Sequence, residues 1–252
     1  KAPDLFTIGR ESHMLIESIP GLRPVDNDWH SNELTAEHAT PPVVNALRIE
    51  FLDRIFPDAR FIYLSRPPRA EISSMIDAWR SGGFATYPDL PGWEGIPWSL
   101  LLIPGWRDLI GKSVQEICAA QWQYTTNKIL DDLDRVAPGR WTVANYHRLT
   151  SDPNAEVARL CRFAELPWDD PLDGPLPLSR HTLTPPSPDK WRRNSTELRE
   201  VLGSVKETAE RANAVAGSPS IVAASPAGDQ PLTSAPRPRQ APAAVDAGQD
   251  PM

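Results

Sequence analysis

The stretch 61-FIYLSRPPRAEISSMIDAW-79 decides the fold, because it joins a strand pattern directly to a helix pattern. An apolar run at residues 60–65, with β-branched and aromatic side chains, is typical of a buried strand. Residues 69–80 then carry apolar side chains at helical spacing. Two prolines separate the patterns and favour a stiff turn, so we predict that Arg66 ends the strand close to the start of a helix.

The alternation of helices and strands continues along the chain. Two helix starts carry capping signals, because 113-SVQE-116 has the pattern of a capping box and Asp152 directly precedes a proline. The predicted order is helix 42–56, strand 60–65, helix 69–80, helix 113–136, strand 141–146 and a helix from Asp152. Helices that alternate with short apolar strands indicate an α/β fold with a parallel sheet.

Length, charge and cysteine content restrict the class of protein. The chain has 252 residues and a formal net charge of -7, which suits one sizeable domain and disfavours general binding to nucleic acid or anionic membranes. No apolar run approaches the roughly 18 residues that span a bilayer. Cys118 and Cys161 lie among apolar residues, so we expect two buried free thiols and a reducing, cytoplasmic compartment.

Composition divides the chain into a domain at residues 1–215 and a tail at 216–252. The tail is rich in Ala, Pro and Ser and has no aromatic residue, so we expect it to be disordered. Within the domain, residues 82–112 are dense in Pro, Gly and Trp and too long for a routine connection. Two interpretations stay open: an ordered lid over an acceptor site, or an insertion that only fills the core.

Arg66 and Ser74 form the candidate binding site. In parallel α/β sheets, ligands bind beyond the carboxyl ends of the strands, where helix N-termini add a positive partial charge. A guanidinium at a strand end and a hydroxyl on the next helix suit a phosphate, because both are fixed donors. The alternative is that Arg66 pairs with a carboxylate of the protein.

The segment 66-RPPRAEISSMIDAW-79 resembles the 3′-phosphate motif of sulfotransferases that use 3′-phosphoadenylyl sulfate (PAPS). That motif has a strand-end arginine, a proline or glycine turn, a second basic residue, and a serine eight positions after the first arginine. Further segments resemble the same family in the same order: 6-FTIGRESH-13, 45-NALRIEFLDRIFPDARFIYLSR-66, 146-YHRLTSDPNAEVARLCRFAELPW-168 and 188-PDKWRRN-194. The nearest resemblance is to the bacterial and tyrosylprotein-like branch.

This resemblance implies a fold, a reaction and a set of roles. The fold would be a three-layer parallel sheet of the P-loop nucleotide-binding type. The reaction would move a sulfuryl group from PAPS to a hydroxyl or amine of a small molecule or peptide, without a metal. Contacts to the nucleotide would come from Arg66, Ser74, Tyr146, Lys190 and Trp191.

Glu11 matches the residue that removes the acceptor's proton in the family. A carboxylate with a pKa raised by burial can do this while the rest of the site holds the reacting groups in line. The alternative for Glu11 is an acid that only stabilises a helix N-terminus. His13 is a weaker candidate for the base.

The sequence also departs from the family pattern. The Gly- and Ser-rich loop for the 5′-phosphosulfate is absent, so we expect an N-terminal truncation, and 38-HATPPVVNALR-48 lacks the lysine of a Lys-Thr-Pro-like segment. Pro67, His147 and Ala78 are further differences, which change the surroundings of the phosphate clamp without removing it. The missing loop and the missing lysine favour an alternative: a non-catalytic remnant that retains only the 3′-phosphate half-site. A P-loop kinase relative would need a Gly-Lys-Ser/Thr loop, which the sequence also lacks.

Overall fold

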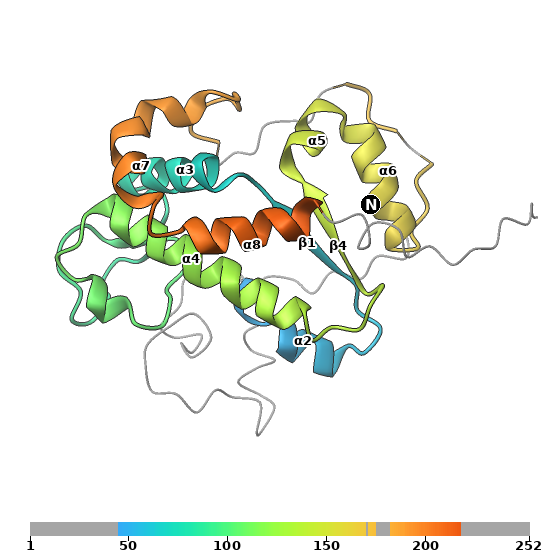
Figure 1. Ribbon diagram of the computed structural model, residues 1–252, viewed down its shortest axis with the longest axis horizontal. Coiled ribbons are helices and arrows are strands. Elements are labelled where there is room, and N and C mark those ends of the chain that lie inside the picture. Colours follow the sequence, from blue (N-terminus) through green and yellow to red (C-terminus); the bar gives the residue numbers. More distant parts are fainter. Residues whose placement is uncertain (1–44, 170, 175–181, 218–252) are drawn as a thin grey trace, which may run out of the picture.

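The computed structural model describes residues 45–169, 171–174 and 182–217 (Figure 1). The helices are η1 (Asn45–Leu47), α2 (Ile49–Ile55), α3 (Pro68–Ser81), η2 (Trp106–Leu109), α4 (Val114–Leu133), α5 (Tyr146–Ser151), α6 (Pro153–Phe163), η3 (Lys190–Asn194), α7 (Ser195–Val201) and α8 (Lys206–Gly217). The strands are β1 (Phe61–Ser65), β2 (Ala85–Tyr87), β3 (Trp98–Ser99) and β4 (Trp141–Asn145).

Strands β1 and β4 pair in parallel, in a register that runs from Phe61 opposite Trp141 to Ser65 opposite Asn145. Phe61 and Tyr63 face a small core with Ile49 of α2, whereas Ile62 and Leu64, on the other face, are exposed. This parallel pair confirms the α/β fold. The extension to a three-layer sheet stays a prediction.

Helix α3 follows β1 as predicted. Pro68 occupies the first turn, where its missing N–H costs nothing, and Gly82 ends the helix in the left-handed conformation with φ 67°. Ile72, Ile76 and Trp79 share one buried face. This face packs against α4 and forms the main core together with residues of α7.

Helices α4 and α6 begin at the predicted caps. Ser113 and Glu116 form the capping box of α4, and the Asp152 side chain accepts a hydrogen bond from the Ala155 N–H at the start of α6. Figure 1 shows α4 and α8 on one side of the β1–β4 pair, with α5 and α6 near the carboxyl end of β4. Within residues 45–169, 171–174 and 182–217, no helix is both long and apolar enough to cross a membrane.

The segment 82–112 is built into the core. Its strands β2 and β3 form an antiparallel pair. Between ring centroids, Trp98 lies 5.3 Å from Trp79 of α3 and 4.8 Å from Trp93, and Trp106 lies 6.2 Å from both Trp93 and Trp98. Buried Gln121 of α4 ties the segment down. It accepts a hydrogen bond from Trp79 Nε1 at 2.9 Å and donates to the carbonyls of Ser99 and Leu101.

Two boundaries differ from the sequence-based expectation. Residues 42–56 are not one helix in the described part, because Arg48 leaves the helical conformation (φ -127°, ψ 17°) between η1 and α2. Tyr146 begins α5 instead of extending β4, because the Asn145 side chain accepts hydrogen bonds from the N–H groups of His147 and Arg148 and so caps that helix.

Both cysteines are free, as expected. Cys118 is buried, whereas Cys161 is only half-buried. Burial raises the pKa of the Cys118 thiol, which makes it unreactive.

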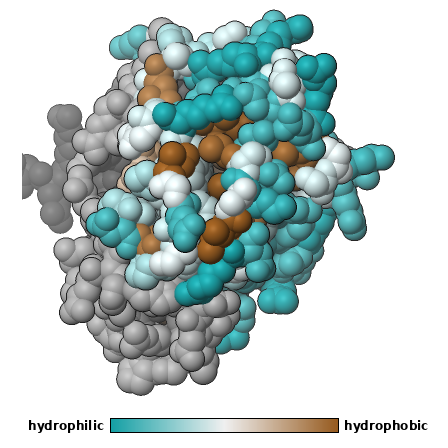
Figure 2. All heavy atoms as spheres, turned by 90° about the vertical axis from the view of Figure 1, so that its left-hand side faces the viewer, coloured by the Kyte–Doolittle hydropathy of each residue, from teal (hydrophilic) through white to brown (hydrophobic). Residues whose placement is uncertain are grey.

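The face of the molecule at the left of Figure 1 is mostly hydrophilic, with separate hydrophobic patches (Figure 2). The predicted tail follows α8 and lies outside the described residues, apart from its first positions.

Candidate anion-binding site

The register of the parallel strands brings Arg66 and Tyr146 together. Ser65 lies opposite Asn145, so the next residue of each chain leaves the sheet at the same edge. The Arg66 guanidinium lies over the Tyr146 ring, 4.7 Å from its centroid. A guanidinium on an aromatic face is stabilised by a cation–π interaction and keeps its N–H edge available for an anion.

Arg66 and Ser74 meet as the sequence spacing predicts. Arg66 Nη1 donates a hydrogen bond to Ser74 Oγ at 3.1 Å, and Ser74 Oγ in turn donates to the Ala70 carbonyl at 3.0 Å. Among the described residues Arg66 forms no ion pair, and Glu71 affects it only through a longer-range charge interaction. The half-buried guanidinium is therefore not neutralised by a carboxylate of the described chain.

These groups border a cavity of about 310 Å³ at the ends of β1 and β4, which we call the anion cavity. The wall from α3 includes Ser74 and Asp77, the opposite wall includes Tyr146, and the segment before η3 closes the remaining side. Its lining residues are Arg66, Glu71, Ser74, Met75, Asp77, Ala78, Phe84, Leu100, Tyr146, Thr182, Leu183, Thr184, Pro186 and Lys190. Volumes of this size are typical of small-molecule sites.

Lys190 adds a second cation to the cavity. Its Nζ donates to the Thr184 carbonyl at 3.0 Å. Burial lowers the pKa of Lys190, repulsion from Arg193 and Arg66 lowers it further, and Asp77 opposes the shift. An anion placed between Arg66 and Lys190 would relieve this repulsion, so the electrostatics of the cavity favour an anionic ligand.

Glu71 introduces a carboxylate between two cavities. It lines the anion cavity, and it also lines a second, largely apolar cavity of about 470 Å³. Trp122 Nε1 donates to Glu71 Oε2 at 3.0 Å. Burial raises the pKa of Glu71, although the Trp122 hydrogen bond and the Arg66 charge both lower it.

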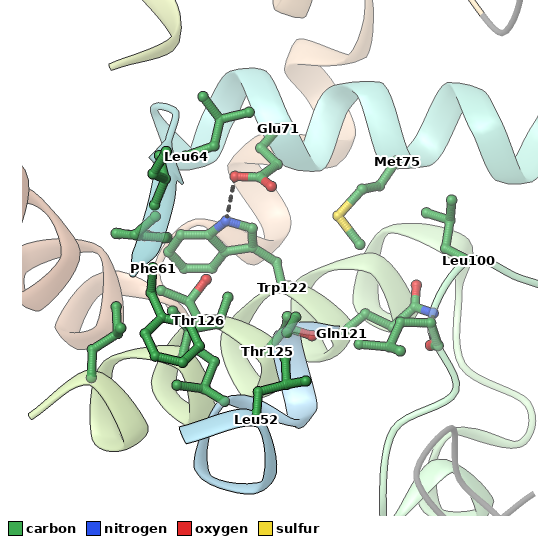
Figure 3. A pocket seen from close by; sticks show the side chains of 17 residues that line it. Leu52, Phe61, Leu64, Glu71, Met75, Leu100, Gln121, Trp122, Thr125 and Thr126 are labelled. Carbon is green, nitrogen blue, oxygen red and sulfur yellow. Dashed lines mark hydrogen bonds between the residues drawn. The ribbon is translucent and has the colours of Figure 1, made fainter. Parts of the chain in front are cut away.

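Figure 3 shows this second cavity around the Trp122 ring. Phe61 and Leu64 of β1 lie on one side, Met75 and Leu100 on the other, and Leu52 of α2 closes the base. The two cavities share Glu71, Met75 and Leu100. These three side chains therefore form the partition between an apolar space and an anionic-ligand site.

Leu100 is strained at this partition. Its φ of 63° lies in the left-handed region, which is unfavourable for a large side chain. The conformation is held from both sides, because the Leu100 N–H donates to the Phe84 carbonyl and the Leu100 carbonyl accepts from Thr86 Oγ1 at 2.5 Å. The segment 82–112 thus supplies part of the wall of both cavities.

The comparison with known families now bears on this site. A family model described as the sulfotransferase family matches residues 39–170, which is more than half of the chain. The chain belongs to the sulfotransferase family. The match includes Arg66, Ser74 and Tyr146 and ends before Lys190. No curated protein and no solved structure matches the chain.

One cavity contains four of the five residues that the resemblance predicts as nucleotide contacts. Arg66, Ser74, Tyr146 and Lys190 line one cavity. Trp191 lies beside it, where its ring stacks on the guanidinium groups of Arg69 and Arg192 instead of lining the cavity. Glu11 and His13 lie outside the described residues, so their roles stay predictions.

Sequence reasoning missed two residues of this part of the molecule. Glu71 was not singled out, although it borders both cavities, and Asn194 was not singled out, although it joins η3 to α3. The sequence gives little signal for Glu71, because the same helix also carries the charged residues Arg69, Asp77 and Arg80. Within the described ranges, no group of three or more His, Cys, Asp or Glu side chains is arranged to hold a metal ion.

Proposed function

We propose that the chain binds the 3′-phosphate of PAPS between Arg66, Ser74 and Lys190 and transfers its sulfuryl group to a hydroxyl or amine. The observation that carries this proposal is the convergence of Arg66 and Ser74 on one cavity, without an ion pair to Arg66 in the described chain. Two fixed donors and two cations match the dianionic charge of a phosphate monoester. Asp77 does not oppose this, because it is paired with Arg193.

In the proposed reaction the acceptor oxygen attacks sulfur, the sulfuryl–phosphate bond breaks, and adenosine 3′,5′-bisphosphate leaves. The proton of the acceptor goes to a carboxylate, for which Glu11 remains the candidate. The chain's contribution is to hold the donor in line and to screen its charge. We also propose that further strands complete a three-layer sheet of the P-loop type and that the chain belongs to the bacterial and tyrosylprotein-like branch.

Arg66→Ala tests the nucleotide site. We expect adenosine 3′,5′-bisphosphate to bind about 1.5 to 3 kcal/mol more weakly by calorimetry, the range for a hydrogen bond to a charged group. Adenosine 5′-monophosphate, which lacks the 3′-phosphate, is the matched ligand and should lose little. If both ligands bind the variant as well as they bind the parent chain, the site assignment is wrong.

A second candidate function is nucleotide binding without transfer. The sequence favours it in one respect, because no lysine occurs between Lys1 and Lys112, where the family has its sulfuryl-stabilising lysine. Transfer of labelled sulfate from PAPS to a mixture of phenols, alcohols and amines distinguishes the two. Binding of the bisphosphate without any labelled product would favour the remnant.

The segment 82–112 is proposed to shape the acceptor side. Phe84 and Leu100 come from this segment and line the anion cavity, which supports that role. Exchange of the segment between related proteins should change acceptor preference and leave bisphosphate affinity unchanged. Unchanged acceptor preference would contradict this role and favour the alternative that the segment only fills the core.

A further inference from the structure

One wall of the anion cavity comes from a part of the chain far from α3 in sequence. Thr184 and Lys190 lie on the segment that leads into η3, more than a hundred residues after Ser74. Lys190 is the first residue of η3, so its position depends on how η3 is attached to α3. The contacts at the other end of η3 make that attachment.

Asn194 is the last residue of η3, and its side chain is almost fully buried at 2% exposure. Its Nδ2 donates to the Ser73 carbonyl at 3.1 Å, to Ser73 Oγ at 3.0 Å and to Asp77 Oδ1 at 3.0 Å. Its Oδ1 accepts from Arg80 Nη1 at 3.1 Å. The amide therefore uses both its donor and its acceptor groups on α3, directly beside Ser74.

A second connection runs parallel to the first on the surface. Arg193 pairs with Asp77 and also donates to Thr184 Oγ1 at 3.3 Å. The Thr184 carbonyl in turn accepts from Lys190 Nζ. A continuous set of contacts thus leads from α3 through Arg193 and Thr184 to the lysine of the cavity.

We propose that Asn194 is a positioning residue for the 3′-phosphate site, because it docks η3 on α3 and so places Lys190 opposite Arg66. This inference rests on the proposed function. Asn194 contacts Ser73, the residue next to Ser74, and Lys190 lies about one turn away on the same short helix. A charge interaction weakens as the distance grows, so a displaced η3 lowers the contribution of Lys190 to anion binding.

Asn194→Ala tests the proposal in the full chain, with Asn127→Ala as the matched control. Asn127 also ties two helices together, because its Nδ2 donates to Thr208 Oγ1 at 3.0 Å, but it lies away from the cavity. We expect Asn194→Ala to weaken binding of adenosine 3′,5′-bisphosphate about tenfold and binding of adenosine 5′-monophosphate less than about twofold. Asn127→Ala should change neither.

A double variant separates positioning from general destabilisation. Because Asn194 acts through Lys190, Asn194→Ala together with Lys190→Ala should bind the bisphosphate within about twofold of Lys190→Ala alone. If the loss of affinity in the double variant equals the product of the two single-variant losses, the proposal is wrong. If Asn194→Ala does not fold, Arg193→Ala removes the exposed connection instead. Compared in an Asp77→Asn background, where no carboxylate is freed in the cavity, it should give about a threefold loss for the bisphosphate only.

The outcomes also distinguish this inference from the proposed function. If Arg66→Ala weakens bisphosphate binding while Asn194→Ala and Arg193→Ala do not, the inference is wrong and the proposed function stands. If Arg66→Ala has no effect, or if the parent chain does not bind the bisphosphate, the proposed function is wrong and the inference is wrong with it.

Discussion

Helix α3 contributes to two regions that are held together in different ways. On one side, Ile76 and Trp79 pack against the tryptophan-rich segment 82–112, whose Trp98, Leu102 and Trp106 side chains are closed off from water. On the other side, Ser74 and Asp77 face the anion cavity, where the groups are charged and only half-buried. One helix therefore serves a packed core and a ligand site at the same time.

The difference predicts that the two regions respond separately to mutation. Burial of large apolar side chains contributes mainly to folding free energy, so changes in the tryptophan segment should lower stability. Half-exposed charged groups contribute little to stability, so changes in the cavity should lower affinity instead. Variants that break this separation would show that the segment and the cavity are mechanically coupled.

Trp98→Ala should have the largest effect. Trp98 is fully buried, lies 5.3 Å from Trp79 and 4.8 Å from Trp93 between ring centroids, and donates from Nε1 to the Leu101 carbonyl. The cavity left behind should reduce the free energy of unfolding by about 3 to 5 kcal/mol, measured by chemical denaturation. Ile96→Ala, at an exposed position of the same segment, is the control and should cost less than about 0.5 kcal/mol.

Gln121→Ala should come second and shows whether the segment is fixed to α4. The variant leaves the Trp79 indole N–H and the carbonyls of Ser99 and Leu101 without their partner, at a loss of about 1 to 3 kcal/mol in unfolding free energy. Gln123→Ala, which removes an exposed hydrogen bond of α4, is the control. A loss near zero would mean that 82–112 is a loosely attached lid.

Glu71→Gln should change how the affinity for adenosine 3′,5′-bisphosphate depends on pH. A protonated Glu71 is compatible with a phosphate near Arg66, and a charged Glu71 repels it, so the affinity of the parent chain should fall as pH rises. The fall begins at the raised pKa of Glu71 in the free protein and cannot exceed about 1.4 kcal/mol per pH unit for one proton. Tyr63, Asp77 and Lys190 also surround this charge.

The phosphate itself and its neighbours titrate in both proteins, so the informative quantity is the difference between the parent chain and Glu71→Gln. That difference should be small at low pH and grow with pH, and calorimetry in buffers of different ionisation enthalpy should detect more proton uptake for the parent than for Glu71→Gln. The stability of the parent should also fall as pH rises above the ordinary carboxyl pKa, because the folded state binds the extra proton. A pH-independent difference would contradict this account.

Local patterns predicted the parts of the fold that depend on neighbouring residues. The apolar run before Arg66, the prolines after it and the capping box at Ser113 each act within a few residues, and the strand, the turn and the helix start lie where they were expected. The expectation of a buried strand is wrong for Ile62 and Leu64, which are exposed. The meeting of Arg66 with Ser74 also follows locally, because strand, turn and helix start are consecutive. The break at Arg48 was missed, because the apolar spacing of residues 42–56 continues through it.

The parts of the site that sequence reasoning missed depend on contacts between distant segments. Trp122 is 51 residues from Glu71, and Asn194 is 121 residues from Ser73. No periodic pattern links such pairs, since each is fixed by how α4 or η3 packs on α3. Asparagine and glutamate are common at exposed helix positions, so the sequence alone does not show that such a side chain is buried. Its burial can be recognised only once its hydrogen-bond partners are known.

Ser74→Ala should give the smallest effect. It shows how much of the binding free energy of the bisphosphate depends on Ser74 and how much on Arg66. Ser74 accepts from Arg66 and donates to the Ala70 carbonyl, so its loss should weaken bisphosphate binding by about 0.5 to 1.5 kcal/mol with little change in stability. Ser81→Ala is the control, because Ser81 makes a similar bond to a carbonyl of the same helix, away from the cavity.

The size of the Ser74→Ala loss relative to that of Arg66→Ala decides how the hydroxyl acts. If Ser74 contacts the phosphate directly, the two losses should add in the double variant. If Ser74 only orients the guanidinium, the double variant should bind no more weakly than Arg66→Ala. Either result keeps both groups in the anion cavity, whereas a Ser74→Ala loss that appears in unfolding free energy instead of affinity would assign Ser74 to the same structural role as the residues on the tryptophan side of α3.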